Sequence, residues 1–293
     1  MLYFLLSSLS FTARNLVNKE YTRHFNSKDS NLLFNTIGLT VTAVISAFIG
    51  GLETPSALLL LLAALFGICF VATVYFLIVS YAKGPLGLVQ LVYGMSSVVP
   101  ICVGVFMFNE PMSWIKGLGL ICVLAVIFLS WRDKEAKNSK SVYIPAKIWL
   151  PVTLLTTLLN GLLSAIQKMM VQWCPGTSTN VFNFWAFSIG ALFGWIILLI
   201  MKLRGKRYPD VSQNLKSFTL ASLLCGLFSS GGNILIMYAL LTIPASVCNP
   251  ALSTLNTIII YLISLFYYKE GHSKYGFYMI GIGIVSIFLL ALG

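Results

Sequence analysis

Long apolar segments dominate this chain, and charged residues stand mostly between them. No charged residue occurs from 54 to 82, from 84 to 109 or from 217 to 268. A helix needs about 20 apolar residues to cross about 30 Å of hydrocarbon, so the longest gap holds two helices, and Pro244 marks their junction. The pattern predicts ten membrane-spanning helices, at 2–19, 31–50, 57–80, 85–107, 113–131, 147–168, 179–201, 217–241, 245–267 and 274–292.

The composition agrees with an integral, multi-pass membrane protein. Of the 293 residues, 58% are hydrophobic and only 9% are charged, against roughly 25% in soluble domains. The segments are continuously apolar rather than alternating, which favours helices over a β-barrel. The first segment has no basic start and no small-residue cleavage pattern, so we keep it as a span rather than a secretory signal.

The chain carries an internal duplication. The segment "LLSSLSFTARNLVNK" begins at Leu5 and the similar "LLTTLLNGLLSAIQK" at Leu154, an offset of 154 − 5 = 149. After a longer hydrophilic segment in the second half, the offset becomes 160, which aligns Glu110 of "FMFNEP" with Glu270 of "FYYKEG". Each half therefore holds five spans, at 1–131 and 147–293, joined by a charged linker at 132–146.

Because five is an odd number, the second half enters the membrane from the opposite side. The predicted fold class is therefore an all-α membrane protein with ten transmembrane helices, arranged as two inverted five-helix repeats. Inverted repeats are a recurring design of secondary transporters, in which the substrate site lies near the bilayer midplane between the repeats.

The sequence resembles the drug/metabolite transporter superfamily of the EamA type over essentially its whole length. The resemblance rests on the five-plus-five plan, on the Asn-Lys or Gln-Lys ending of spans 1 and 6, and on the run from Pro100 through Glu110 to Gly119. A weaker copy of that run extends from Tyr267 to Gly283. The resemblance implies a secondary transporter with a central cavity lined by spans 1, 3, 4, 6, 8 and 9, and it leaves the substrate open.

Polar residues recur at helical spacing on four spans and predict the cavity face. Polar groups in hydrocarbon are costly unless they meet each other, water or a ligand. The stripe of span 6 consists of Thr153, Thr157, Asn160, Ser164 and Gln167. Tyr75 and Tyr238 would add aromatic walls to the cavity. The alternative is that these residues only hold helices together. The candidate substrate-binding residues are Arg14, Ser7, Ser10, Asn18, Tyr75, Gln90, Tyr93, Ser97, Asn160, Ser164, Tyr238, Asn249, Ser253 and Asn256.

Arg14 is the sharpest single feature. It stands about 18 Å along span 1, where a charge costs about 3 kcal/mol, and its counterpart in the second half is Leu163. One reading gives it a partner in an aqueous cavity, and another lets it extend to the interface near Lys19. We favour the first. A guanidinium suits bidentate contact with a carboxylate or phosphate, which predicts an anionic or zwitterionic solute.

The acidic residues and the remaining reactive side chains limit the chemistry. No Asp or Glu lies deep in a span, so an intramembrane carboxylate for proton exchange is missing. Glu110 and Glu270 each precede a helix, where a carboxylate caps free amides. The six cysteines stand singly and both histidines lie between spans, so we expect no enzyme, no metal site and no cofactor.

Basic residues bear on orientation. All of the 19 Lys and Arg residues except Arg14, Lys116 and Lys168 lie in or beside the connections after spans 1, 3, 5, 7 and 9. The positive-inside rule then places both termini outside, whereas the resemblance implies termini inside, and both stay open. The net charge of +11 fits attraction to anionic headgroups rather than nucleic acid.

The leading functional prediction is a secondary transporter in the cell membrane. It would move a small polar metabolite, such as an amino acid, by alternating access. The expected partners are that solute, the lipid bilayer and a possible coupling ion, and the chain would act as a monomer or a homodimer. The direction of transport stays open. The alternative is a membrane scaffold or receptor that transports nothing, in which the polar stripes only pack.

Overall fold

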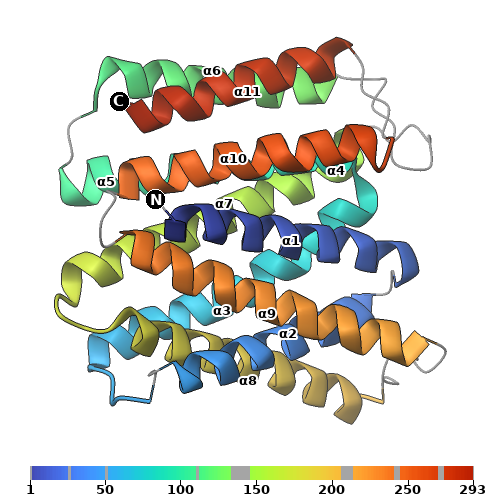
Figure 1. Cartoon of the computed structure of the whole chain (residues 1–293), viewed down its shortest axis with the longest axis vertical. Coiled ribbons are helices and arrows are strands. Elements are labelled where there is room, and N and C mark those ends of the chain that lie inside the picture. The colour runs from blue at the N-terminus through green and yellow to red at the C-terminus, as the bar shows by residue number, and fades with distance from the viewer. Residues whose placement is uncertain are drawn as a thin grey trace. The chain divides into compact units, whose positions relative to one another are not determined.

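The computed structural model describes residues 2–25, 28–49, 52–109, 112–132, 146–205, 214–240, 245–269 and 274–292, and these residues are helical except at short connections. Helices lie at all ten predicted spans (Figure 1). Glu110, Glu270 and most of the predicted linker lie outside the described residues. The helices are α1 Leu2–His24, α2 Lys28–Phe48, α3 Ala57–Lys83, α4 Leu86–Gly94, α5 Val98–Phe108, α6 Trp114–Arg132, α7 Ala146–Trp173, α8 Thr179–Leu203, α9 Leu215–Leu240, α10 Ala245–Phe266 and α11 Lys274–Leu292.

Some helix ends differ from the predicted limits. α1 continues past residue 19 to His24, and α7 continues past residue 168 to Trp173. The extension of α1 is polar, whereas that of α7 is mostly apolar and belongs to a stretch that is apolar enough to cross a membrane. The apolar pattern marks the part of a helix that suits hydrocarbon, whereas the backbone hydrogen bonds continue beyond it.

The fourth span is helical over nearly all of its predicted length, 85–107, but its α-helix is interrupted by one tighter turn. A short 3-10 segment, Met95–Ser97, separates α4 from α5. Pro100 has no backbone N–H and so cannot donate to the carbonyl of Ser96, which an uninterrupted α-helix would require. Tighter 3-10 turns are common where an α-helix is interrupted in this way.

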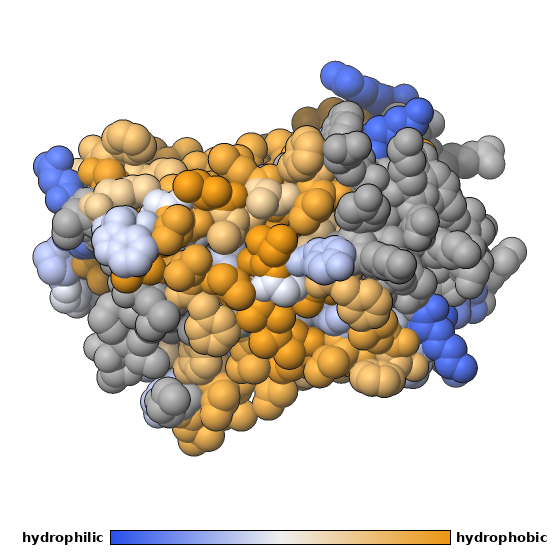
Figure 2. All heavy atoms as spheres, turned by 90° about the horizontal axis from the view of Figure 1, so that it is seen from above, coloured by the Kyte–Doolittle hydropathy of each residue, from blue (hydrophilic) through white to orange (hydrophobic). Residues whose placement is uncertain are grey.

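Among the described residues, six helical stretches are long and apolar enough to cross a membrane. They lie in α2, α3, α4 to α5, α7, α8 and α9, and shorter apolar stretches lie in α6, α10 and α11. α1 falls below this measure because Arg14, Lys19 and its polar stripe lower its hydropathy. On the face drawn in Figure 2, hydrophobic residues cover most of the coloured surface, as lipid contact requires.

The chain forms two compact units. Unit 1 comprises Met1–Ile78 and Ile166–Ala239, and unit 2 comprises Val79–Ala165 and Leu240–Gly293. Each unit contains helices from both halves of the sequence, and α3 and α7 run from one unit into the other. The units are therefore not the two predicted sequence repeats.

In unit 1, close helix crossings are built on glycine. α2 packs along α8, as Figure 1 shows. A Cβ added to Gly67 of α3 would lie 2.3 Å from the backbone oxygen of Ala186 and 2.8 Å from the backbone nitrogen of Gly190, both in α8. A Cβ added to Gly226 of α9 would lie 2.6 Å from the backbone oxygen of Gly38 in α2. These backbones approach so closely that only glycine fits.

In unit 2, α6 packs along α11, and α10 packs against α4 and α11 (Figure 1). The Ser286 hydroxyl of α11 donates to the Gly119 carbonyl of α6 at 2.9 Å. The Trp149 ring of α7 is fully buried and lies against Gly84, just before α4. The interrupted turn of the fourth span is packed as well, since Gly283 of α11 lies against Leu91 and Met95.

Helix ends recur along the chain at fixed offsets. α6 and α11 have 19 residues each, and both their starts and their ends are 160 apart (274 − 114 and 292 − 132). α1 and α7 end 173 − 24 = 149 residues apart. Asn109 and Lys269, which follow α5 and α10 at an offset of 269 − 109 = 160, both adopt a left-handed φ of 49°. The offsets of 149 and 160 are the same two that align the first half of the sequence with the second.

Candidate functional site

The polar face of α1 lies along α9 in unit 1. The Ser7 hydroxyl donates to the Gly232 carbonyl at 2.9 Å, and the Phe11 ring lies directly on Gly232. Farther along α1, the Asn18 side-chain oxygen accepts a hydrogen bond from the Cys225 thiol at 3.3 Å. Ser7 near the start of α1 contacts Gly232, whereas Asn18, later in α1, contacts Cys225, which comes earlier in α9. The two helices are therefore antiparallel. Three residues of the predicted stripe of span 1, Ser7, Arg14 and Asn18, are therefore buried, whereas Ser10 is half-buried.

Arg14 lies inside this interface with only neutral partners. The side chain is 5% exposed, its Nε and Nη2 donate to the Asn15 oxygen at 3.4 and 3.2 Å, and its guanidinium carbon lies 5.1 Å from the centre of the Phe11 ring. No carboxylate pairs with Arg14 in the part of the chain that the structure describes. The arginine thus stays buried instead of extending to the end of the helix.

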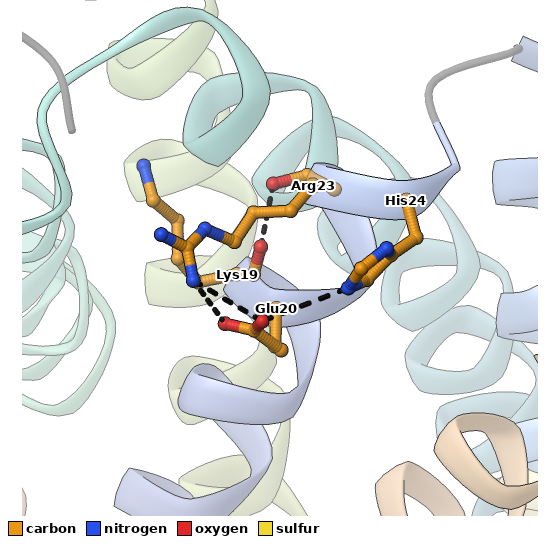
Figure 3. Close-up of polar contacts among 5 residues, drawn as sticks. Lys19, Glu20, Arg23 and His24 are labelled. Carbon is orange, nitrogen blue, oxygen red and sulfur yellow. Dashed lines mark hydrogen bonds and ion pairs between the residues drawn. The ribbon is translucent and has the colours of Figure 1, made fainter. Parts of the chain in front are cut away.

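Glu20, the acidic residue of α1, is held at the end of the helix. Its carboxylate accepts from the Arg23 guanidinium at 3.2 Å and faces the His24 ring at 3.8 Å (Figure 3). Both partners lie about one turn along the same helix, so the Glu20 carboxylate pairs with side chains of α1 itself. Lys19, which we expected at the interface, is only 3% exposed.

The other end of unit 1 carries an aromatic pair. Tyr238 of α9 lies 5.8 Å from Tyr3 of α1 between ring centres. The Asn180 side-chain nitrogen donates to the Tyr238 hydroxyl at 3.2 Å and to the Ile49 carbonyl at 3.0 Å. Tyr75 is half-buried in α3, with its ring 5.4 Å from that of Phe76.

A second polar cluster lies in unit 2, where α7 crosses the broken fourth span. The Tyr93 hydroxyl donates to the Asn160 oxygen at 2.7 Å, and the Asn160 nitrogen donates to the Ser96 hydroxyl at 2.7 Å. The Thr157 hydroxyl donates to the Val92 carbonyl at 3.1 Å. Gly161 lets the helices meet, because a Cβ there would lie 2.4 Å from Val99. The structure thus brings Tyr93 and Asn160 together.

The remaining candidates of unit 2 lie around this cluster or on α10. Ser97, 3% exposed, has a buried hydroxyl without a hydrogen-bond partner, and the Gln90 oxygen accepts from the Tyr81 hydroxyl at 2.8 Å. Five further candidates, of which Ser10 belongs to unit 1, are described by a bond within their own helix, by their exposure alone or not at all. Ser10 and Ser164 donate to carbonyls of their own helices, Ser253 is half-buried, Asn256 is 5% exposed, and the side chain of Asn249 lies outside the described residues.

Sequence reasoning missed residues that contact the candidates. Asn15 and Phe11 flank the Arg14 guanidinium, and Cys225, one of the six singly placed cysteines, bonds to Asn18. One signal was available in the sequence. α9 carries its own buried polar stripe at helical spacing, formed by Ser222, Cys225, Ser229 and Asn233.

The Tyr93–Asn160 bond gives a measurable coupling. We expect Tyr93→Phe and Asn160→Ala each to lower the stability of the detergent-solubilised protein, and the double variant to lose less than their sum. Interhelical hydrogen bonds in membrane proteins show couplings of about 0.6 kcal/mol on average and about 1.7 kcal/mol at most. A double-mutant cycle on the unfolding free energy measures the coupling. Strictly additive losses would contradict a bond between the two side chains.

The second half of the chain is similar to a known family of transporters. Residues 147–292, which cover α7 through α11 and make up about half of the chain, match the model of the EamA-like transporter family. A comparison with curated proteins gives no match.

Proposed function

Since the chain belongs to the EamA-like transporter family, we propose that it moves a small anionic or zwitterionic metabolite, such as an amino acid, across the membrane by alternating access. The observation that carries this proposal is Arg14, a buried guanidinium with neutral partners in the middle of α1. A charge in that position is costly, by about 3 kcal/mol on insertion scales. A solute that brings a negative group would offset that cost.

We propose that the two halves form an inverted repeat. The recurring helix ends support a duplication, and five helices in each half reverse the direction of the second. A two-fold axis also brings counterpart elements into contact with each other. Three such pairs pack together, namely α2 with α8, α4 with α10, and α6 with α11. The crossings of Gly38 with Gly226 and of Gly67 with Gly190 are related in the same way, within three residues (38 + 149 = 187 and 226 − 160 = 66).

The proposed solute path runs between α1 of the first half and α9 of the second. Arg14 would hold the negative group of the solute, with Phe11 supporting the guanidinium from one side. Rearrangement of helices from the two halves would expose this site first to one side of the membrane and then to the other. The bound solute would neutralise Arg14 while the site is closed to water.

Flux through proteoliposomes tests the proposal. A thermal-shift screen of anionic and zwitterionic metabolites against the purified protein first selects solutes, because a ligand that binds the folded state raises its stability. Counterflow of the selected radiolabelled solutes then measures transport, and imposed proton or sodium gradients report a coupled ion. Absence of flux for every solute, in a folded and correctly inserted preparation, would contradict transport.

The second candidate function is a scaffold or receptor without transport. The hydrogen bonds of Ser7 to Gly232 and of Asn160 to Tyr93 and Ser96 favour it, because these polar side chains are satisfied between helices. In that case their polarity serves packing alone.

Cysteine accessibility separates the two functions. We introduce cysteine singly at positions 7, 14, 93 and 253 in a chain without its native cysteines, and measure reaction with a membrane-impermeant thiol reagent. In a transporter these positions reach water during the cycle, so we expect modification within minutes of exposure from one side or the other. Protection at all four positions, with a loop cysteine reacting normally, would support the sealed scaffold.

A further inference from the structure

We propose that Arg14 and Asn18 together form a binding site for a monoanionic oxyanion such as a carboxylate, and that Cys225 positions Asn18 in its donating orientation. This inference rests on the proposed transport function and names the part of the solute that α1 recognises. It is based on the Asn18 side-chain nitrogen, which has no acceptor, and on the charge of Arg14, which has only neutral partners. Neither Asn18 nor Cys225 bears a charge, and their contribution follows from the direction of their hydrogen bond.

Asn18 presents a buried donor without an acceptor. The residue is fully buried, and its side-chain nitrogen has no hydrogen-bond partner. Its oxygen is occupied by the Cys225 thiol at 3.3 Å. A buried polar group without a partner is costly to a fold, so the position is expected to have an acceptor in the working protein. Arg14 and Asn18 are four residues apart and therefore lie on the same face of α1.

Cys225 connects the two donors. Its side chain is 4% exposed on α9, and its thiol donates to the Asn18 oxygen, one helical turn from Arg14 along α1. Since the thiol occupies the Asn18 oxygen, the amide keeps its N–H groups for a ligand. Rotating the amide would break the bond to the thiol. Cys225 is thus a positioning residue, and Arg14 and Asn18 are the groups that would touch the ligand.

The donor set defines the class of ligand. A guanidinium offers a planar fork of N–H groups that matches two oxygens on one atom, and an amide N–H adds a third donor. Arg14 supplies one positive charge, which one carboxylate neutralises in the low-dielectric interior. A monoanionic oxygen ligand therefore fits the site better than a cation.

Charge-selective labelling of Cys225 tests the site without transport. In the full chain with Cys69, Cys102, Cys122, Cys174 and Cys248 replaced by alanine, Cys225 is reacted with an anionic sulfonatoethyl or a cationic trimethylammonioethyl methanethiosulfonate. The thiol first gives its proton to water, and the resulting thiolate then attacks the sulfenyl sulfur of the reagent, so that a disulfide forms and methanesulfinate leaves. We expect the ratio of anionic to cationic rates to fall about tenfold in Arg14→Gln, because a charged cleft concentrates the opposite ion.

Two further variants sharpen this test. Arg23→Gln removes the same charge at the exposed end of α1 and should leave the ratio unchanged. Asn18→Asp keeps an acceptor for the thiol but replaces the free donor with a carboxylate, so it should remove the preference for the anionic reagent. Failure of Cys225 to react with either reagent, or an equal ratio with and without Arg14, would overturn the proposed site.

The role of Cys225 needs its own readout. Acetate, a small monoanionic carboxylate, should raise the unfolding temperature of the purified protein. Cys225→Ser keeps a donor for the Asn18 oxygen and should retain this shift, whereas Cys225→Val should lose it. An equal response of the two variants would overturn the positioning role. A charge-selective site without solute flux would instead indicate an anion receptor, and flux without charge selectivity would leave transport intact and remove the site.

Discussion

Arg14→Gln is expected to abolish transport of an anionic solute while leaving the protein folded. The guanidinium is the positively charged group buried against Asn15 and Phe11, and glutamine keeps a polar side chain there without the charge. Hydrogen bonds to charged groups contribute about 1.5 to 3 kcal/mol each, so loss of a two-pronged contact lowers kcat/KM by about a hundredfold or more. Stability should stay level or rise, because an uncompensated buried charge is removed.

Arg14→Lys separates charge from geometry. Lysine keeps the positive charge but not the planar fork, so we expect an intermediate loss, expressed mainly in KM. Initial rates in proteoliposomes, normalised to inserted protein, measure both variants. Arg23→Gln serves as the matched control, since it removes a charge from an exposed position of the same helix. Wild-type kinetics in Arg14→Gln would end any role for Arg14 in the solute path.

The helices of this protein are predictable from sequence because lipid imposes a simple rule. An apolar stretch of about 20 residues is long enough to cross the hydrocarbon as a helix, and charges mark its limits. α1 falls below a hydropathy threshold, and its similarity to residues 154–168 of α7 supports its prediction as a span. The burial of the stripe of α1 was also predictable, since polar side chains avoid lipid.

The partners of those side chains were not predictable. Which residue of α9 meets Asn18 depends on the crossing of two helices, and helical spacing fixes only the face that each presents. The thiol of Cys225 in an apolar sequence resembles any packing residue, and its polar role becomes visible only through its contact at 3.3 Å. The interruption at Met95–Ser97 had a signal in the sequence, because Gly94 and Pro100 flank it and either can kink a helix, although the apolar pattern continues through it.

The two halves share helix ends but differ in polar chemistry at aligned positions. Arg14 corresponds to Leu163 (14 + 149), which is 5% exposed, and Phe11 corresponds to Asn160 (11 + 149). Phe11 lies on Gly232 beside the charge, whereas Asn160 braces the broken fourth span through Tyr93 and Ser96. We infer that duplication supplied the helices, and that charge recognition and helix bracing then diverged between the copies.

Gly67→Ala is expected to be the most destabilising single-methyl change in unit 1. The added Cβ would lie 2.3 Å from the Ala186 carbonyl oxygen and 2.8 Å from the Gly190 nitrogen, and both are backbone atoms that cannot rotate away. α3 and α8 must then separate, which breaks contacts along both helices. Overpacking of this kind costs about 3 kcal/mol at the upper end of its usual range.

Gly38→Ala is the matched control, because it adds the same methyl group to another glycine crossing. Its Cβ would lie 3.6 Å from the nearest atoms, an ordinary van der Waals distance. Alanine also favours a helix over glycine by about 1 kcal/mol, so this variant should be as stable as the parent or more so. Unfolding in detergent, followed by circular dichroism, measures both variants. Equal stabilities would contradict the close contact between α3 and α8, since the two substitutions differ only in the space that receives the methyl group.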